Sequence, residues 1–450
     1  MKSRKYAKVS PTLPGKKASE VVKKTSEYVS PSISRFYPLV VESAHGSLVK
    51  DVDGNQFIDF SSGIAVLNTG STHPMVVQAI KQQAEKFVHF SYTDFYYENL
   101  VDLSRQLNSV VPGEFGKMVY YGNSGAEANE AAMKLSRNYT KRQLFLAHSG
   151  SFHGRTYGAM SLTASKPIQR KGSSPLVPGV VHFPFPYCYR CPWKQTFPEC
   201  DYYCIDYFKE QYLDKFVPVD EVAAYFFEPI QGEGGYVPAP PEYFKRMEFL
   251  RKAGVLFSDD EIQSGMGRTG KYFAIEHYGV VPDIVTIAKG IASGMPLSAT
   301  VAKAEVMKSW EPGQHASTFG ANPVAVQAAL ATLQVMKSER LVENARRLGK
   351  KAMKRLLEMK EKYEIVGDVR GTGLFIGVEI VKSKKTKERG VKEAEQIIQY
   401  CFHHGLLAIT AGRNTLRIIP PLNTSEEVLS EGLDILEEAI SETNKATMKG

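Results

Sequence analysis

Apolar segments of strand length alternate with helical segments through most of this chain, and the alternation restricts the possible folds more than any other feature. Helices such as 126–142 and 323–337 separate buried strands that we expect at residues 117–121, 144–147, 222–228, 255–262, 284–288 and 298–302. Because these strands are continuously apolar, they suit a mostly parallel sheet covered by helices on both faces. The sequence therefore predicts an α/β fold.

The two ends of the chain predict a second, smaller unit. A hairpin-like segment occupies 47–60, and after residue 340 come a cationic helix at 341–362 and strand-like segments at 373–381 and 416–419. The length of 450 residues allows two or three domains. We expect a large α/β domain at 76–335 and a small α+β domain at 336–450, to which the N-terminal segment 1–75 contributes.

Charge and hydropathy limit the partners of the protein. Of the net charge of +8, +7 lies in the first 24 residues, so the rest of the chain is nearly neutral. Tyr6 is the single aromatic residue among those cations, too few to form a stacking platform, and we expect no nucleic-acid binding. No apolar run is long enough for a membrane span, and the N-terminus lacks the apolar region of a secretory signal. We expect a cytoplasmic protein without membrane contact.

Three short segments carry groups that make chemical sense together. A Ser-Gly turn at Ser124 ends one strand and opens a helix, which offers backbone N–H groups to a phosphate. At another strand end, alternation places Asp260 and Ile262 on one face and Asp259 on the other, so Asp260 can meet a ring nitrogen. Lys289 follows an apolar strand, where burial would lower its pKa and make it a nucleophile toward carbonyls.

A phosphate cradle, a carboxylate for a pyridinium nitrogen and a desolvated lysine together describe pyridoxal phosphate bonded to that lysine. The competing motifs are weaker. The GxGxxG pattern at 265–270 follows an acidic strand end that would repel a pyrophosphate. GxSxG, HExxH and Walker motifs are missing from the sequence. We therefore expect pyridoxal-phosphate chemistry rather than a hydrolase, a nucleotide triphosphatase or a dinucleotide site.

Eight ordered segments between about residues 37 and 423 carry a family resemblance. They are DFSSGIAVLN (59–68), NSGA (123–126), FHGRT (152–156), EPIQGEGG (228–235), DEIQSGMGRTG (260–270), AKG (288–290), TFGANP (318–323) and LRIIPPL (416–422). With these segments the chain resembles class III aminotransferases of the fold-type I pyridoxal-phosphate enzymes, and it is most similar to 4-aminobutyrate aminotransferases. The resemblance implies the fold-type I architecture and a homodimer or higher homo-oligomer.

The resemblance also implies which residues contact the cofactor: Ser124, Gly125, Ala126, Phe152, Asp260, Ile262, Gln263, Lys289 and Thr318. In this pattern Lys289 and Asp260 are catalytic: Lys289 holds the cofactor and moves a proton, and Asp260 keeps the ring nitrogen protonated. Phe152 stacks on the ring, and Thr318 comes from the second subunit. Many relatives have Ser or Thr where this chain has Ala126, so one hydroxyl donor to the phosphate is absent here.

Four further residues resemble the substrate-binding set of the family. Arg155 would take the distal carboxylate of 4-aminobutyrate or glutamate, and Arg417 an α-carboxylate. Glu233 would pair with Arg417 when the amino donor has no α-carboxylate, and Ile64 matches an apolar gate. We expect a ping-pong aminotransferase that moves an amino group from 4-aminobutyrate or a related ω-amino acid to 2-oxoglutarate. The alternatives are an amino-acid racemase or epimerase on the same scaffold and an ornithine or acetylornithine aminotransferase.

A cysteine pattern remains open at this stage. Cys188, Cys191, Cys200 and Cys204 lie in an insertion rich in Pro and aromatic residues, and Cys401 stands alone. The four could bind zinc or an iron–sulfur cluster, could form two disulfides, or could be free thiols. We assign no metal-binding residue from the sequence.

Overall fold

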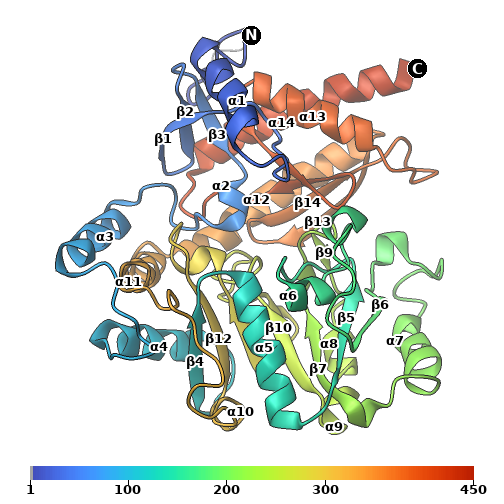
Figure 1. Cartoon of the computed structure of the whole chain (residues 1–450). Coiled ribbons are helices and arrows are strands. Elements are labelled where there is room, and N and C mark those ends of the chain that lie inside the picture. The colour runs from blue at the N-terminus through green and yellow to red at the C-terminus, as the bar shows by residue number, and fades with distance from the viewer. Residues whose placement is uncertain (1–3, 450) are drawn as a thin grey trace.

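A seven-stranded sheet forms the centre of the computed structural model, which describes residues 4–449 (Figure 1). Its strand order is β4-β12-β11-β10-β7-β5-β6, and only β12 runs antiparallel to its neighbours. The mostly parallel α/β sheet predicted from the sequence is thus confirmed. The strands are β4 (Lys117–Gly122), β5 (Leu144–Ser149), β6 (Val180–Pro184), β7 (Val222–Phe227), β10 (Leu256–Asp260), β11 (Ile284–Ile287) and β12 (Ser298–Lys303).

Helices cover this sheet and explain why its strands are continuously apolar. Every residue of β7, β10 and β11 is buried. Helix α5 (Gly125–Thr140) packs across β4, β7, β10, β11 and β12, and α9 (Phe249–Lys252) packs on β10. The remaining helices of this part are α3 (Pro74–Lys86), α4 (Glu98–Val110), α6 (Tyr157–Leu162), α7 (Tyr203–Phe208), α8 (Tyr243–Arg246), α10 (Ala304–Met307) and α11 (Pro323–Ser338).

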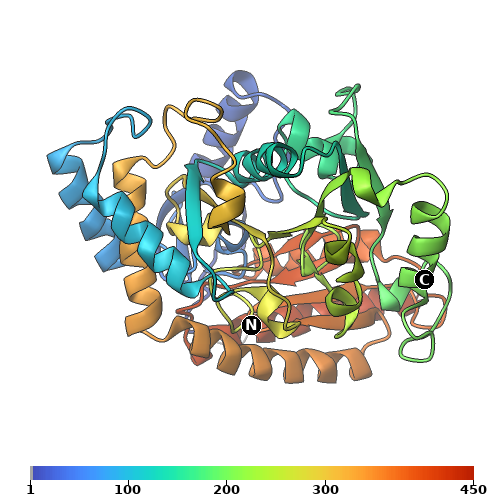
Figure 2. The ribbon, with the colours of Figure 1, turned by 90° about the horizontal axis from the view of Figure 1, so that it is seen from below.

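A second group of elements lies above the large sheet in Figure 1. Its antiparallel sheet has the order β13-β14-β17-β16, and Figure 2 shows the long helix α12 running along the edge of the molecule beside these strands. The elements are α12 (Leu341–Lys362), β13 (Val366–Thr372), β14 (Phe375–Ile380), α13 (Val391–His403), β16 (Ile409–Ala411), β17 (Thr415–Ile418) and α14 (Glu426–Lys449).

The N-terminal strands join this second group. Strands β1 (Val41–His45), β2 (Leu48–Asp51) and β3 (Gln56–Asp59) form an antiparallel sheet, and β15 (Leu406–Leu407) pairs in parallel with β3. The two ends of the chain therefore share one sheet, while the domain boundaries at 75 and 335 stay predictions. The smaller elements are α1 (Lys16–Tyr28), α2 (Ser62–Ala65), β8 (Ile230–Gln231) and β9 (Val237–Pro238). Across residues 4–449, no helix is long and apolar enough to cross a membrane.

The glycine-rich segment after β10 holds the two sheets together. Gly267 and Gly270 have φ of +86° and +82°, conformations that glycine tolerates best. Between them, the fully buried Arg268 donates to Asn68 Oδ1 at 2.6 Å and to the carbonyl oxygen of Pro420. The segment that matches GxGxxG therefore has a structural role: through Arg268 it connects parts of the chain that are distant in sequence.

Candidate active site

A cavity of about 440 Å³ lies where the loops after β4, β5, β10 and β11 converge. Ligands of open α/β sheets bind outside the carboxyl ends of parallel strands, and this cavity has that position. Nine of the residues predicted from the sequence line it: Ser124, Gly125, Ala126, Phe152, Arg155, Asp260, Ile262, Gln263 and Lys289. The structure thus brings segments up to 165 positions apart, Ser124 to Lys289, around one space.

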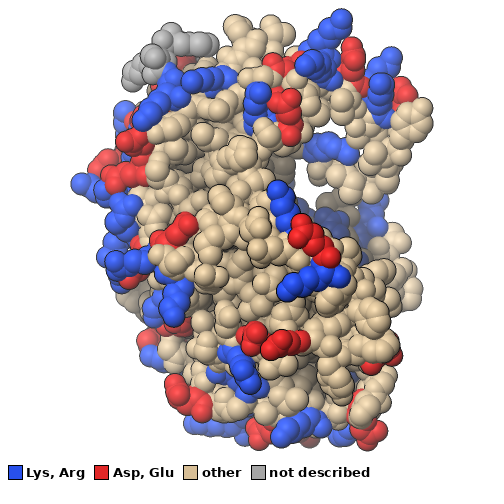
Figure 3. Space-filling model, turned by 90° about the vertical axis from the view of Figure 1, so that its left-hand side faces the viewer, with Lys and Arg blue, Asp and Glu red and all other residues tan. Residues whose placement is uncertain are grey.

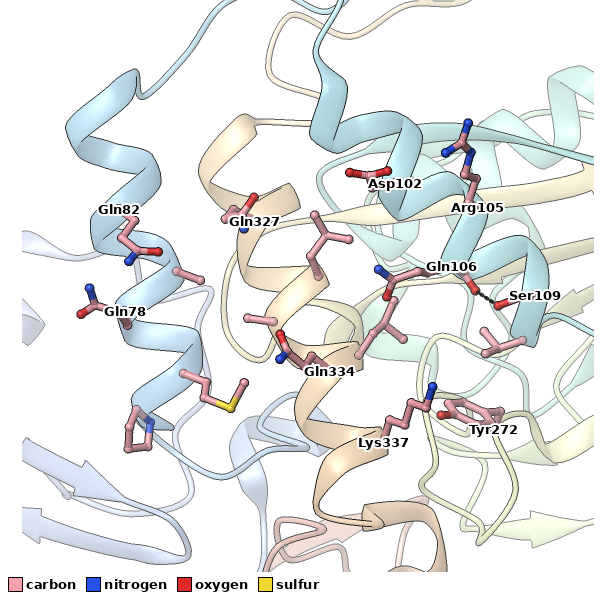
Figure 4. Close-up of a pocket in the computed structure, with 17 residues that line it drawn as sticks. Gln78, Gln82, Asp102, Arg105, Gln106, Ser109, Tyr272, Gln327, Gln334 and Lys337 are labelled. Carbon is pink, nitrogen blue, oxygen red and sulfur yellow. Dashed lines mark hydrogen bonds between the residues drawn. The ribbon is translucent and has the colours of Figure 1, made fainter.

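A larger surface groove of about 1210 Å³ lies away from these loops, between α3, α4 and α11 (Figure 4). Figure 4 shows glutamine side chains along it, among them Gln78 and Gln82 on α3 and Gln327 and Gln334 on α11, together with Asp102, Arg105 and Lys337. It lacks the strand-end lysine and the buried carboxylates of the smaller cavity. The groups able to perform chemistry therefore lie in the 440 Å³ cavity.

The N-terminus of α5 forms the anion-binding end of the cavity. Ser124 caps the helix by accepting a hydrogen bond from Glu127 N at 3.3 Å. Within residues 4–449, the N–H groups of Gly125 and Ala126 have no hydrogen-bond partner. A Cβ atom on Gly125 would come within 2.8 Å of the Ile262 side chain, so only glycine lets the helix approach this closely. Free N–H groups at a helix N-terminus suit a phosphate.

Asp260 is held by a buried hydrogen-bond network at the other end of the cavity. Its Oδ2 accepts from His153 Nδ1 at 2.7 Å and from Asn129 Nδ2 at 2.8 Å. Burial by itself would lower the pKa of His153, but the hydrogen bond and charge of Asp260 raise it instead. Thr286 Oγ1 in turn donates to Asn129 Oδ1 at 2.9 Å. This network fixes the direction in which the Asp260 carboxylate points.

Asp259 lies outside the cavity, as strand alternation predicts. It is fully buried, and its carboxylate oxygens have no hydrogen-bond partner within residues 4–449. Burial, followed by the charges of Glu261 and Asp260, raises its pKa well above the usual range, which favours the neutral form of this carboxyl group. Strand β10 ends at Asp260 rather than at the expected residue 262, and a turn brings Ile262 to the cavity.

Lys289 follows β11 at the start of a short 3-10 turn and lines the cavity. Burial lowers its pKa, while the nearby Glu233 opposes that effect. Its φ of +48° is uncommon for a residue with a side chain, and such strain is concentrated at functional sites. A desolvated amine at this place is a nucleophile toward a carbonyl carbon.

Glu233 and Arg417 form an ion pair beside Lys289. Arg417 Nη2 lies 2.6 Å from Glu233 Oε1, and Arg417 Nε donates to Thr410 O at 2.9 Å. Burial by itself would raise the pKa of Glu233, but Arg417, Lys166 and Lys289 lower it. The buried Nη1 of Arg417 has no partner within residues 4–449. That nitrogen is available to a carboxylate that enters the site.

Four predicted residues do not belong to the cavity lining: the paired Glu233 and Arg417, together with Ile64 and Thr318. Ile64 is 44% exposed on α2, with φ of +65°, and its neighbour Val66 lines the cavity instead. Thr318 is exposed on a loop whose Ser317 accepts a hydrogen bond from Asn123 at 3.2 Å. Arg155, although it lines the cavity, is exposed at its rim rather than enclosed in a dry pocket.

The structure adds residues that the sequence alone did not assign. Glu228 lines the cavity and accepts from Phe152 N at 3.1 Å, and burial raises its pKa to about 7. Lys166 Nζ lies 3.9 Å from Glu233 Oε2. Tyr236 donates to Gln263 Oε1 at 2.6 Å, which leaves the amide nitrogen of Gln263 free for a ligand. One of the unassigned residues could have been suspected from the sequence. Asn129 is a polar residue on the buried face of α5, and such a residue usually has a specific hydrogen-bond partner.

These groups fit pyridoxal phosphate. The free N–H groups of α5 match its phosphate, Asp260 its ring nitrogen, and the desolvated Lys289 its aldehyde. Phe152 and Ile262 provide apolar walls between which a flat ring can lie. The fold and the cavity together define a fold-type I pyridoxal-phosphate enzyme.

Comparison with known proteins gives the same class. Residues 29–440 match the family described as aminotransferase class-III, and the chain belongs to this family of pyridoxal-phosphate-dependent enzymes. Leucine/methionine racemase from Thermococcus litoralis is 44% identical over 95% of this chain and 96% of its own length. A probable 4-aminobutyrate aminotransferase from Bacillus subtilis is 37% identical over 92% and 95%.

Solved structures also agree. An amine transaminase from an uncultivated Pseudomonas species, in its cofactor-bound form, has a TM-score of 0.83 and 28% identity. The match covers 90% of this chain and 95% of that one. The prediction of a pyridoxal-phosphate-dependent class III aminotransferase is confirmed.

Proposed function

We propose that the protein moves an amino group from 4-aminobutyrate or a related ω-amino acid to 2-oxoglutarate. The observation that carries this proposal is the closed pair of Glu233 and Arg417 beside Lys289. Glu233 neutralises Arg417 while the amino donor lacks an α-carboxylate, and it is displaced when 2-oxoglutarate brings one. A single site can then accept both substrates in turn.

The cofactor supplies an aldehyde that takes up the amino group and a ring that accepts electrons from the reacting carbon. The residues of the chain do the remaining work. The amine of Lys289 would move a proton between the carbon that carries the amino group and the aldehyde carbon of the cofactor. Asp260, held by His153 and Asn129, stabilises a proton on the ring nitrogen. Arg155, at the rim, attracts the distal carboxylate of the substrate.

We further propose that the enzyme works as a homodimer in which Thr318 reaches the phosphate of the partner subunit. The supporting feature is a continuous apolar surface around this residue. Asn322 donates to Val88 O at 3.1 Å, and the rings of His89 and Phe319 lie 5.3 Å apart, which joins two segments into one patch. Its exposed members are Phe87, Val88, Phe90, Phe95, Tyr96 and Phe319.

Such patches are rare on monomers and mark interaction sites. Figure 3 views the side of the molecule that carries α3, α4 and α11, and it shows a broad central area with few charged side chains. A surface of this composition suits a second copy of the chain. The patch adjoins the loop of Thr318, so the same contact would complete the cofactor site.

The similarity to a leucine/methionine racemase favours a second candidate, an amino-acid racemase or epimerase. In that case Arg417 would take the α-carboxylate of a neutral amino acid, Lys289 would serve one face of the carbon, and a proton would have to be delivered to the opposite face from elsewhere. The proposed aminotransferase needs a keto acid as its second substrate, whereas a racemase does not.

A substrate panel distinguishes the two functions. Wild-type enzyme is incubated with 4-aminobutyrate, ornithine, leucine, methionine or alanine, with and without 2-oxoglutarate. We expect glutamate to form from 4-aminobutyrate only when 2-oxoglutarate is present, as chromatography of the products would show. Inversion of leucine or methionine without a keto acid, together with no reaction of 4-aminobutyrate, would replace the proposal by the second candidate.

A further inference from the structure

The insertion between β6 and α7, at the right of Figure 1, carries thiols that the active site does not use. Cys188, Cys191, Cys200 and Cys204 all line one small cavity of about 20 Å³. A single water molecule needs roughly 10–15 Å³, so the cavity has room for one ligand of about that size. The four thiols are not joined in disulfides.

We propose that these four cysteines bind one structural zinc ion. The spacings Cys188-x2-Cys191 and Cys200-x3-Cys204 match the paired ligands of tetrahedral zinc sites built from four cysteines. A cavity of about 20 Å³ has room for a single ion. Within residues 4–449, no three potential ligands already surround one point closely enough to hold an ion. The thiols must therefore rotate about χ1 when the ion enters.

The chemistry of the four thiols suits the binding of a cation. Cys188, Cys191, Cys200 and Cys204 line the same small cavity, so their thiols can face one common ion. When Zn²⁺ binds, four Zn–S bonds form and the four thiol protons pass to the solvent. The ion thereby converts four crowded neutral thiols into ligands.

The position of the cluster gives the ion a structural task. Residues 186–202 contain only one short 3-10 turn, Cys188–Arg190, so the segment has little backbone pairing of its own. The same turn reaches the second sheet, because Tyr187 and Arg190 both donate to the carboxylate of Glu379 in β14. Arg190 also donates to Lys387 O at 2.7 Å. Zinc bound at the cysteines would hold the segment 186–202 in place between the two sheets.

Metal content tests the proposal directly. The holoenzyme is produced with added zinc, purified with a phosphine reductant and without chelator, and analysed by plasma mass spectrometry. We expect about one zinc per chain in the wild type and in Cys401→Ser, which changes the lone buried cysteine of α13. Cys188→Ser with Cys204→Ser should retain none, while the cofactor absorbance of that variant persists.

Two further measurements keep the test decisive if the double variant folds poorly. In wild-type enzyme stripped by a chelator, added Zn²⁺ should raise the melting temperature and protect the four clustered thiols from a thiol reagent, while the buried Cys401 stays unreactive in the folded enzyme. Four reactive thiols with no effect of zinc would show free cysteines. Four thiols that react only after reduction would show two disulfides, and bound iron would show a cluster. Each of these three results would overturn the proposal.

Discussion

The carboxylates of β10 show how much of the site can be read from residue types and strand alternation. Asp260 and Asp259 are adjacent in sequence, yet only Asp260 lines the cavity and is paired with His153. Alternation predicted this difference. The partners His153 and Asn129 could not be predicted, because their roles depend on segments that lie more than 100 positions from Asp260 in the chain.

Substitution of each aspartate tests this assignment. Asp260→Asn should lower the rate about 10²-fold or more, because an uncharged amide does not stabilise the proton on the ring nitrogen. Asp259 does not line the cavity, so Asp259→Asn should change the rate little. Steady-state kinetics of both variants at saturating cofactor provide the measurement. A larger loss for Asp259→Asn would mean that the wrong carboxylate had been placed on the ring.

The raised pKa of Glu228 predicts a dependence of stability on pH. Its pKa rises from 4.5 to about 7 in the folded protein, mainly through burial. The folded state therefore holds this proton more tightly than the unfolded state. The resulting stability is complete below pH 4.5 and is lost as the pH rises to about 7, which amounts to about 3 kcal/mol.

Glu228→Gln cannot lose that proton, so its stability relative to the wild type should increase by about 3 kcal/mol between pH 4.5 and pH 8. Urea unfolding of both proteins across this range, at one fixed cofactor concentration, measures the difference. The other buried acids are present in both proteins, so their contributions to the pH dependence cancel in the difference between the two. Parallel pH profiles would show that Glu228 titrates normally.

At the scale of elements, the sequence predicted six strands of the large sheet but missed β6. Strand β6 ends at Pro184 and has only one fully buried residue, so it lacks the apolar run that marks the central strands. The end of β10 was placed two residues late, because the turn at 261–263 depends on contacts of Glu261 with Ser264 and Ile275. Element types follow from local pattern, whereas their ends depend on tertiary contacts.

The close approach of α5 to Ile262 gives a prediction for this element. Gly125→Ala would place a methyl group 2.8 Å from Ile262, which forces the helix N-terminus or the ring-facing side chain to move. We expect the dissociation constant of the cofactor to rise about tenfold or more. Titration of cofactor-free enzyme, followed by absorbance, measures it.

Gly116→Ala is the matched control, because the nearest atom to its added Cβ lies 3.7 Å away. That variant should bind the cofactor as the wild type does. Equal affinity in both variants would show that the N-terminus of α5 does not form the phosphate site.

At the scale of the whole molecule, the mostly parallel sheet and the grouping of Ser124, Asp260 and Lys289 in one site were predicted from the sequence. The resemblance also implied a homo-oligomer, but the contact surface could not be predicted, because apolar side chains such as Phe319 become a patch only when the fold places them beside the segment around Val88. The proposed dimer therefore rests on the resemblance together with the folded surface.

Subunit complementation tests whether Thr318 acts across the dimer. Lys289→Ala and Thr318→Glu should each be nearly inactive, the first without its amine and the second with a carboxylate near the phosphate. In a mixed dimer of the two, one site would contain both defects and the other neither, so about half of the wild-type activity should return. Co-expression with two different tags allows the mixed dimer to be isolated. No recovery of activity would place Thr318 in the site of its own chain.

The central claim, that Glu233 and Arg417 let one site serve two unlike substrates, is tested most directly by single-turnover half-reactions. Glu233→Gln leaves the buried Arg417 cation unpaired when 4-aminobutyrate binds, but glutamate supplies its own α-carboxylate as partner. Cofactor absorbance after rapid mixing should show the 4-aminobutyrate reaction slowed about tenfold or more and the glutamate reaction unchanged or faster. Equal effects on both half-reactions, or no reaction of the wild type with 4-aminobutyrate, would contradict the account.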